Sequence, residues 1–370
     1  MLTYLIPFII LILVVVFIHE YGHYYFARKY GVGVTDFSIG FGKEIFGWND
    51  KSGTRWKICW IPLGGYVKFF GDRNVFSQAD HEKILKQYNK EDQEKLFVIK
   101  PLYQRALIVF GGPLANFLLA IVIFFSIYTF IGKDFTPAVI NEVQKDSPAM
   151  IGGLQQNDII IEIDGNKVNS IMDVSKFITT STDEFIEFKV NRSESDFLLK
   201  VKPNIVLSDD NLGNKINKRM VGIKLGAYNN EINHVKLGPA QALIHSIKEV
   251  YFVSASSLKY IGSMLRGTGD SSQLGGPIRI AKITGQVAEI GILPFISIMA
   301  YISISLGLIN LFPIPMLDGG HLMFYAFEKF LGRPLSQKVQ EGFFRIGVFL
   351  LLSLMFFTTF NDLKDLGLFN

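Results

Sequence analysis

An uncharged apolar run at the start of the chain most restricts how this sequence can fold. Residues 2–18 carry no charged side chain and consist mostly of Leu, Ile, Val and Phe. Continued to residue 27, the run is long enough for a helix of about 20 residues to cross a bilayer. It lacks a basic leading region and a small-residue cleavage site, so it is expected to be retained rather than removed as a signal peptide. We therefore predict a membrane-spanning helix at 2–27.

A histidine–glutamate motif, His19-Glu20-Tyr21-Gly22-His23, stands at the end of this run. Because positions i and i+4 of a helix share one face, His19 and His23 can hold one Zn²⁺ while Glu20 lies beside them as general base. The alternative is a pair of helix-end histidines at the membrane interface with a solvated Glu20. Placing polar and ionisable side chains in lipid costs free energy, so their presence in this apolar run favours a functional site over the interfacial alternative. The motif predicts a zinc hydrolase whose metal lies within the membrane.

Three further apolar runs, at about 105–132, 293–314 and 343–361, are also long enough to span a bilayer. The mean hydropathy of +0.29 fits a polytopic membrane protein with sizeable aqueous parts. The predicted fold class is therefore an α-helical polytopic membrane protein with about four transmembrane helices. The net charge of +4 is small and no basic cluster indicates nucleic acid as a partner. The single cysteine, Cys59, excludes an intrachain disulfide.

The charges between the runs predict an orientation in the membrane. Arg28 and Lys29 follow the first span directly, and residues 28–104 hold more Lys and Arg than Asp and Glu. The positive-inside rule then places residues 28–104 and 315–342 in the cytoplasm. The region 133–292 and both termini are expected on the opposite side.

Residues 35–72 alternate apolar and polar side chains and are rich in glycine, which is typical of β-structure. Because they follow the motif helix, we predict membrane-associated β-hairpins on the cytosolic side that could dip toward the metal. An ordinary cytosolic hairpin is the alternative. Residues 77–104 are charged and are expected to form a cytosolic helix and linker.

Residues 136–205 are predicted to form a separate extracytoplasmic α+β domain. Ser147-Pro148-Ala149 opens a helix, and residues 157–165 form a strand that closes in a turn. This pattern resembles PDZ domains, which receive an extended peptide as an added strand; a spacer without a ligand groove is the alternative. Residues 206–292 are expected to be a linker that contains an amphipathic helix at 239–265.

A catalytic zinc usually takes a third protein ligand and keeps a position open for water. The third span runs into residues 310–321, where two prolines precede Asp318 and two glycines follow it. The backbone can unwind there and present the carboxylate, at the same cytosolic end as the two histidines. The alternative is an aspartate in a tight Asp-Gly turn. His321 is a competing ligand or an outer partner, ranked below Asp318.

Six motifs follow one another along the chain: the histidine motif, Phe37-Ser38-Ile39-Gly40-Phe41-Gly42, Pro62-Leu63-Gly64-Gly65-Tyr66-Val67, Gly112-Pro113-Leu114-Ala115-Asn116, Gly275-Gly276-Pro277-Ile278 and the stretch 310–320. In this order they resemble the motifs of site-2 proteases, specifically the bacterial regulator of sigma-E protease type, over nearly the whole chain. By this resemblance, His19, His23 and Asp318 bind one Zn²⁺ per chain and Glu20 activates water. The same resemblance implies a substrate-positioning role for a further set of residues. The substrate-positioning residues are Asn310, Asn116, Gly64, Gly65 and Tyr66.

The resemblance also implies an intramembrane zinc endopeptidase in the inner membrane of a bacterium. Its substrates would be single-span membrane proteins, such as anti-sigma factors or remnant signal peptides, that an upstream site-1 protease has already trimmed. The PDZ-like domain would then exclude untrimmed chains by size. Two other classes stay open: a non-proteolytic PDZ adaptor with a vestigial metal site, and a metal-dependent transporter with intramembrane His and Asp as an ion path. The absence of an evident internal repeat in the sequence argues against the transporter.

Overall fold

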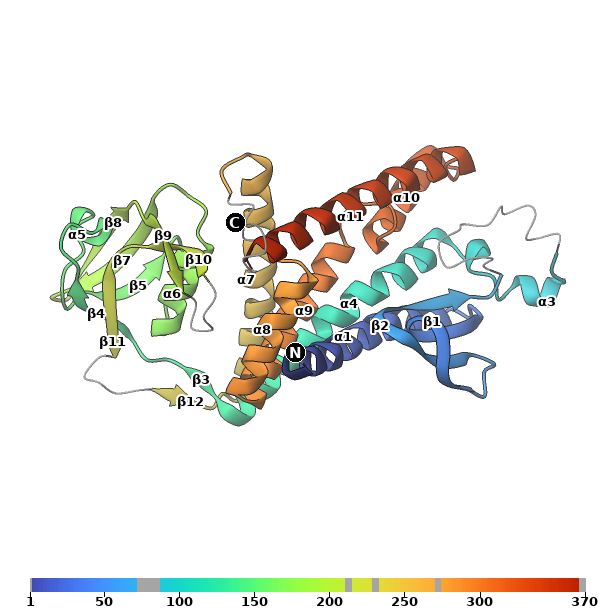
Figure 1. Ribbon diagram of the computed structural model, residues 1–370, viewed down its shortest axis with the longest axis horizontal. Helices are drawn as coiled ribbons and strands as arrows, with labels where there is room; N and C mark the ends of the chain where they lie inside the picture. The colour runs from blue at the N-terminus through green and yellow to red at the C-terminus, as the bar shows by residue number, and fades with distance from the viewer. Residues whose placement is uncertain (1, 72–86, 210–214, 228–232, 270–273, 366–370) are drawn as a thin grey trace. The chain divides into compact units, whose positions relative to one another are not determined.

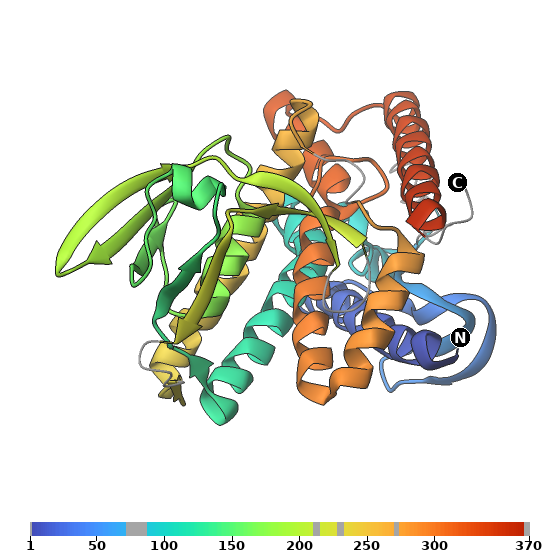
Figure 2. The same cartoon turned by 60° about the vertical axis from the view of Figure 1, so that its left-hand side comes forward.

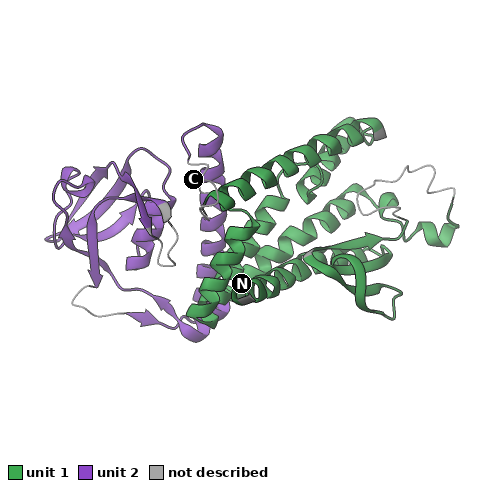
Figure 3. Ribbon diagram, in the orientation of Figure 1, with its two compact units in different colours: residues 1–123, 275–370 green, residues 124–274 purple. Residues whose placement is uncertain are grey.

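The computed structural model describes residues 2–71, 87–209, 215–227, 233–269 and 274–365 (Figure 1). The chain divides into two compact units, shown in different colours in Figure 3. The first unit comprises Met1–Ile123 and Gly275–Asn370, and the second comprises Phe124–Leu274. Part of the predicted cytosolic segment at 77–104, residues 77–86, lies outside the described residues.

Four helices in the described chain are long and apolar enough to cross a membrane, so the protein is a multi-pass membrane protein. This confirms the predicted helical part of the fold class. The third span ends at Asn310, earlier than the predicted residue 314, because two prolines follow and proline cannot continue a helix. The helices that contain the spans are α1 (Leu2–Lys29), α4 (Leu102–Ser126) with the π-helical turn η2 (Ile127–Ile131), α9 (Ile292–Asn310) and α11 (Gln337–Asp365).

Glycines allow α1 and α4 to approach each other with their backbones in contact. A Cβ placed on Gly111 would lie 2.7 Å from the carbonyl oxygen of Gly22, and a Cβ on Gly22 would overlap with the Gly111 carbonyl. Lipid is as apolar as the helix surfaces, so close packing of small residues replaces the hydrophobic effect in holding such helices together. A shorter helix, α8 (Pro277–Ile290), packs against α1, α9 and α11 (Figure 2).

Two long strands, β1 (Val34–Asn49) and β2 (Arg55–Phe69), pair antiparallel and pack against α1 (Figure 2). Residues 36–39 have partners on both sides, 55–58 and 65–68, so the two strands curl into a small sheet. Glycines with positive φ lie where the strands bend, among them Gly64 with φ of 124°. The short helices α3 (Lys90–Gln93) and η1 (Phe97–Ile99) follow before α4.

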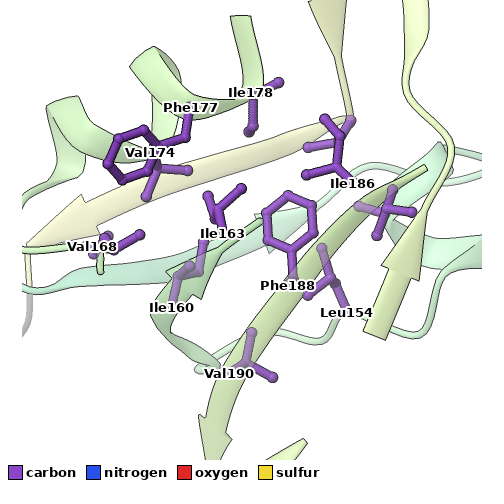
Figure 4. Close-up of a cluster of buried hydrophobic side chains, with 14 of the residues drawn as sticks. Leu154, Ile160, Ile163, Val168, Val174, Phe177, Ile178, Ile186, Phe188 and Val190 are labelled. Carbon is purple, nitrogen blue, oxygen red and sulfur yellow. The ribbon is translucent and has the colours of Figure 1, made fainter. Parts of the chain in front are cut away.

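The second unit contains an α+β domain, as the predicted fold class requires. Its sheet has the strand order β11-β4-β5-β7-β8, with β6 paired to β5. Ile186, Phe188 and Val190 alternate along one strand and are fully buried in the core drawn in Figure 4. Ser147 and Ser170 cap the two helices, the second in a capping box with Asp173. The elements are β4 (Ala138–Val143), α5 (Pro148–Ile151), β5 (Ile159–Ile163), β6 (Asn166–Lys167), α6 (Ile171–Thr180), β7 (Ile186–Arg192) and β8 (Ser195–Val201).

The domain continues beyond residue 205, so the segment 206–292 is not the linker that we expected. Strand β11 (Ile223–Ala227) forms one edge of the sheet beside β4, and α7 occupies Pro239–Leu265, the predicted amphipathic segment. Strands of two to six residues are too short to show a clear alternation, and the partners of β11 lie far away in sequence. The other strands are β9 (Asn204–Asp209), β10 (Lys215–Met220), and β12 (His234–Val235), which pairs with β3 (Lys133–Asp134).

Candidate metal centre

Three side chains predicted as metal ligands lie together in the first unit. His19 Nε2 lies 3.2 Å from Asp318 Oδ2 and 3.2 Å from His23 Nε2, and His23 Nε2 lies 3.5 Å from Asp318 Oδ1. The three side chains are only 9%, 12% and 16% exposed, in the order His19, His23, Asp318. The structure therefore brings together two segments of the chain that are nearly 300 residues apart in the sequence.

These separations suit a tetrahedral zinc ion. Nitrogen and oxygen ligands at about 2.0–2.2 Å from a tetrahedral zinc lie roughly 3.3–3.6 Å from one another. Asp318 Oδ2 is also buried without a hydrogen-bond partner among the described residues, as expected of a carboxylate oxygen that serves as a metal ligand. The three residues thus form a candidate metal site, and zinc fits its donor set.

Helix α1 places the two imidazoles on one face because they are four residues apart, and α4 holds them there. His23 Nδ1 lies 2.9 Å from the carbonyl oxygen of Ile108, so the ring donates from Nδ1 and leaves Nε2 free as a ligand. Gly112 permits this approach. A Cβ at that position would overlap with His23 Nε2 and would lie 2.9 Å from His19 Cε1.

The carboxylate of Asp318 comes from the first residue of α10 (Asp318–Leu331), after the break that follows α9. Met316 in this break has a φ of 91°, which non-glycine residues rarely adopt and which costs conformational energy. Gly320 is packed against the loop, since a Cβ there would lie 2.5 Å from the carbonyl oxygen of Ile314. The predicted unwinding before Asp318 is therefore present, and it includes backbone strain next to the site.

Burial acts to raise the pKa of the Asp318 carboxyl, but the neighbouring His23 and His19 hold that pKa below its usual range. The group is therefore ionised near neutral pH. His321 lies one turn further along α10, outside the three-residue cluster, with its ring against Phe324 and Phe344. Burial lowers the pKa of His321, so its imidazole is neutral.

Glu20 projects beside the cluster toward the second strand of the hairpin. Its carboxylate accepts a hydrogen bond from the backbone amide of Val67, and a Cβ on Gly65 would lie 3.1 Å from Glu20 Cγ. Gly65 therefore lets β2 pass directly against the glutamate. Strand β2 therefore lies against Glu20, the predicted general base, next to the candidate ligands.

A cavity of about 440 Å³ opens onto these groups. Four of the residues predicted to position substrate line it: Gly64, Gly65, Tyr66 and Asn310. The amide nitrogen of Asn310 lies 3.4 Å from His19 Nε2. Asn116, the fifth, is placed differently: it is fully buried and lies behind His19, outside the cavity lining.

One ion pair in this unit was not predicted from the sequence. Arg105 on α4 binds Glu328 on α10 through two hydrogen bonds, of 3.1 and 2.5 Å, and its guanidinium lies 5.2 Å from the ring centre of Tyr325. Arg105 also lines the cavity. The pair fastens the helix that begins with Asp318 to the helix that supports both imidazoles. No local sequence pattern predicts this ion pair, because Arg105 and Glu328 are 223 residues apart in the sequence.

One protein family and two known relatives match nearly the whole chain. Peptidase family M50 matches residues 7–354. A predicted zinc metalloprotease of Agrobacterium fabrum is 40% identical over 363 residues, which cover 98% of this chain and 96% of that protein. Metalloprotease MmpA of Caulobacter vibrioides is 32% identical over 389 residues, covering 100% and 97%. The PDZ domain of an SdrC-like protein from Listeria monocytogenes is 22% identical over 25% of this chain and 88% of its own, with a TM-score of 0.20.

The family match covers nearly the whole chain, including the histidine motif, the hairpin strands and Asp318. Peptidases of this family cleave membrane-protein substrates. The chain belongs to peptidase family M50 and is a zinc metalloendopeptidase.

Proposed function

We infer that this protein is an intramembrane endopeptidase of the regulator of sigma-E protease type, which cuts membrane-spanning segments of single-span proteins. The observation that carries this proposal is the position of the candidate ligands. His19 and His23 lie inside one apolar span and Asp318 follows another, and all three border a cavity that residues of the spans α1, α4 and α9 also line. A protease site in that position acts on chains that reach it through the membrane.

His19, His23 and Asp318 would hold one zinc ion. When bound, Zn²⁺ polarises the scissile carbonyl and lowers the pKa of a water molecule toward about 7. His23 donates from Nδ1 to the Ile108 carbonyl, so the Nε2 atom of the neutral ring would be its ligand atom, and Asp318 would supply a carboxylate oxygen.

Glu20 would act as general base and then as general acid. Its carboxylate takes one proton from the attacking water, whose oxygen adds to the scissile carbonyl carbon. When the carbon–nitrogen bond breaks, Glu20 returns that proton to the leaving amine, so the reaction consumes one water and releases two chain ends. The Val67 amide that binds the carboxylate keeps it oriented toward the cavity.

The substrate must unwind before cleavage, because a helix hides its carbonyl groups within its own hydrogen bonds. The segment Gly64–Val67 borders the cavity and pairs with β1, and no other described strand pairs with it. An unwound substrate could add to β2 there as a further strand. Asn310 would donate a hydrogen bond to the substrate backbone near the metal.

The substrates expected are single-span proteins already trimmed by a site-1 protease, such as anti-sigma factors, and remnant signal peptides. We place residues 28–104 and 315–342 in the bacterial cytoplasm, with the termini and the PDZ-like domain in the periplasm, from the distribution of Lys and Arg. The domain would exclude untrimmed chains by their bulk.

The test is cleavage of tagged single-span substrates, with and without a bulky outer domain, by the wild type and by Glu20→Gln. We expect zinc-dependent cutting of the trimmed substrate, and a fall of about 100-fold or more for Glu20→Gln, because the general base is lost. Zinc content should stay the same in both proteins. Cutting that survives Glu20→Gln would remove Glu20 from the mechanism, and equal cutting of the bulky substrate would remove the size filter.

A further inference from the structure

Both candidate imidazole ligands have a partner on α4 behind them. The Nδ1 atom of His23 donates to the Ile108 carbonyl, and the Nδ1 atom of His19 lies 3.2 Å from the amide nitrogen Nδ2 of Asn116. Ile108 and Asn116 are eight residues apart, about two helical turns, and so lie on one face of α4. The same face carries Gly112, whose missing side chain leaves room for the rings.

Asn116 is closed off from the cavity by the third span. Its side chain is 0% exposed, and its backbone carbonyl accepts a hydrogen bond of 2.9 Å from the hydroxyl of Ser303 on α9. A Cβ on Gly307, one turn further along α9, would lie 3.3 Å from the Asn116 Cβ. A substrate in the cavity therefore meets Asn310 but has no path to Asn116.

The chemistry of His19 decides what Asn116 must offer. The Nε2 atom of His19 faces Asp318 and His23, so a metal held by the cluster takes the lone pair of Nε2. A neutral imidazole that gives its Nε2 lone pair carries its proton on Nδ1, and Nδ1 is then a donor. The partner at Nδ1 must therefore be an acceptor. Asn116 Oδ1 is buried and has no hydrogen-bond partner among the described residues.

We propose that Asn116 is a positioning residue for the metal centre: its Oδ1 accepts a hydrogen bond from His19 Nδ1–H and fixes the ring in the ligating tautomer. A half-turn of the carboxamide exchanges Oδ1 and Nδ2 in a nearly identical shape and brings the oxygen to Nδ1. Asn116 then does for His19 what the Ile108 carbonyl does for His23. This assignment replaces the substrate contact expected for Asn116 and rests on the proposed zinc site.

The experiment compares zinc affinity and Co²⁺ absorption spectra of the full-length wild type, Asn116→Leu and Asn116→Asp in detergent. Leucine has a similar shape but accepts no hydrogen bond, so zinc affinity should fall 10- to 100-fold and the Co²⁺ spectrum should change. Aspartate offers only acceptors, so its zinc affinity should equal or exceed that of the wild type. At saturating zinc, Asn116→Leu should keep the wild-type KM. Leu118→Ala, at an exposed position two residues away on α4, is the control and should leave both readouts unchanged.

The outcomes separate this inference from the proposed function. If the wild type binds zinc and Asn116→Leu binds it equally well, or raises KM at saturating zinc, the positioning role is overturned and the protease remains. If Asn116→Asp weakens zinc binding, Asn116 donates to His19 and the proposed acceptor is overturned, even should Asn116→Leu fail to fold. If the wild type binds no zinc, the proposed function falls, and this inference with it.

Discussion

In the unit that carries the candidate metal centre, helices approach most closely at glycines and at buried polar side chains, beside ordinary apolar contacts, whereas the α+β unit has one large core of interdigitating apolar side chains. Gly22 and Gly111 bring α1 and α4 together, and Gly112 admits the imidazoles. In the second unit, Phe188 and its alternating neighbours fill the space between the sheet and α6 (Figure 4). Close packing at glycines is thus prominent in the first unit, and burial of large apolar side chains is prominent in the second.

The difference follows from the surroundings of each unit. An apolar side chain gains little by leaving lipid for a protein interior, so the helices of the first unit are specified by fit and by hydrogen bonds. In the second unit, burial of apolar area from water stabilises the fold in proportion to the area. Adding a methyl group at a glycine contact should therefore be most disruptive in the first unit. Truncating a buried apolar side chain should be most destabilising in the second unit.

The largest effect is expected from Gly112→Ala. The new methyl group would overlap with His23 Nε2 and crowd His19 Cε1, and the opposing atoms are ring atoms of candidate ligands. Either α4 moves away or the imidazoles turn, and zinc affinity should fall on the order of 100-fold or more, beyond what loss of one outer partner causes. Peptide cleavage should be lost with it. Zinc titration and the cleavage assay measure both.

Gly342→Ala in α11 is the matched control for that substitution. Nothing lies within 4 Å of a Cβ at Gly342, and alanine is favoured over glycine in a helix by about 1 kcal/mol. Activity and zinc affinity should stay at the wild-type level. Normal zinc binding by Gly112→Ala would contradict the close approach of α4 to the imidazoles.

The next effect concerns Phe188→Ala in the second unit. Phe188 is fully buried, and truncation of a buried phenylalanine typically costs about 3–5 kcal/mol. Hydrogen exchange of residues 138–227 in the full-length protein should become faster, while zinc affinity stays unchanged because every candidate ligand lies in the first unit. Phe197→Ala, which removes a half-exposed ring, should change the exchange rates much less. A fall in zinc affinity for Phe188→Ala would show that the two units are energetically coupled.

The sequence was most informative where a function depends on a local pattern. The four-residue spacing of His19 and His23 fixes their common face on a helix, and the prolines and glycines around Asp318 predict an unwound backbone there. In each case the physical cause lies within a few residues of the side chain that it positions. The spans were predictable for the same reason, since each is one continuous apolar run.

Contacts between distant segments could not be predicted in this way. The pairing of Arg105 with Glu328 and the approach of Asn116 to His19 depend on how helices cross, which no single segment encodes. Asn116 illustrates the limit: the motif that contains it was recognised, but its burial behind His19, away from the cavity, required the structure. Strand β11 was missed because its partner strand β4 lies far away in the chain.

The smallest effect is expected at the start of α8, where a carboxylate from another helix replaces the usual cap. The residue before α8, Gly276, has no side chain to cap the helix, and Asp362 on α11 accepts hydrogen bonds from the backbone amides of Gly276, Ile278 and Arg279. Asp362 is 2% exposed, so water does not replace these bonds. The Asp362 carboxylate thus joins α11 to the start of α8, so a buried polar contact contributes to helix packing in the first unit.

Asp362→Asn keeps the shape and one acceptor oxygen but removes the charge. A hydrogen bond to a charged acceptor contributes about 1.5–3 kcal/mol and one to a neutral acceptor about 0.5–1.5 kcal/mol. Because the amide nitrogen of asparagine cannot accept, at least one of the three bonds is lost, and the substitution should destabilise the α8 contact by about 2–3 kcal/mol. Faster hydrogen exchange in the first turns of α8, with cleavage activity retained, would meet this expectation. Lys364→Gln, an exposed change on the same helix, should leave the exchange rates as they are. If Asp362→Asn behaves like Lys364→Gln, the carboxylate does not stabilise α8, and the packing of this helix on α1, α9 and α11 suffices to hold it.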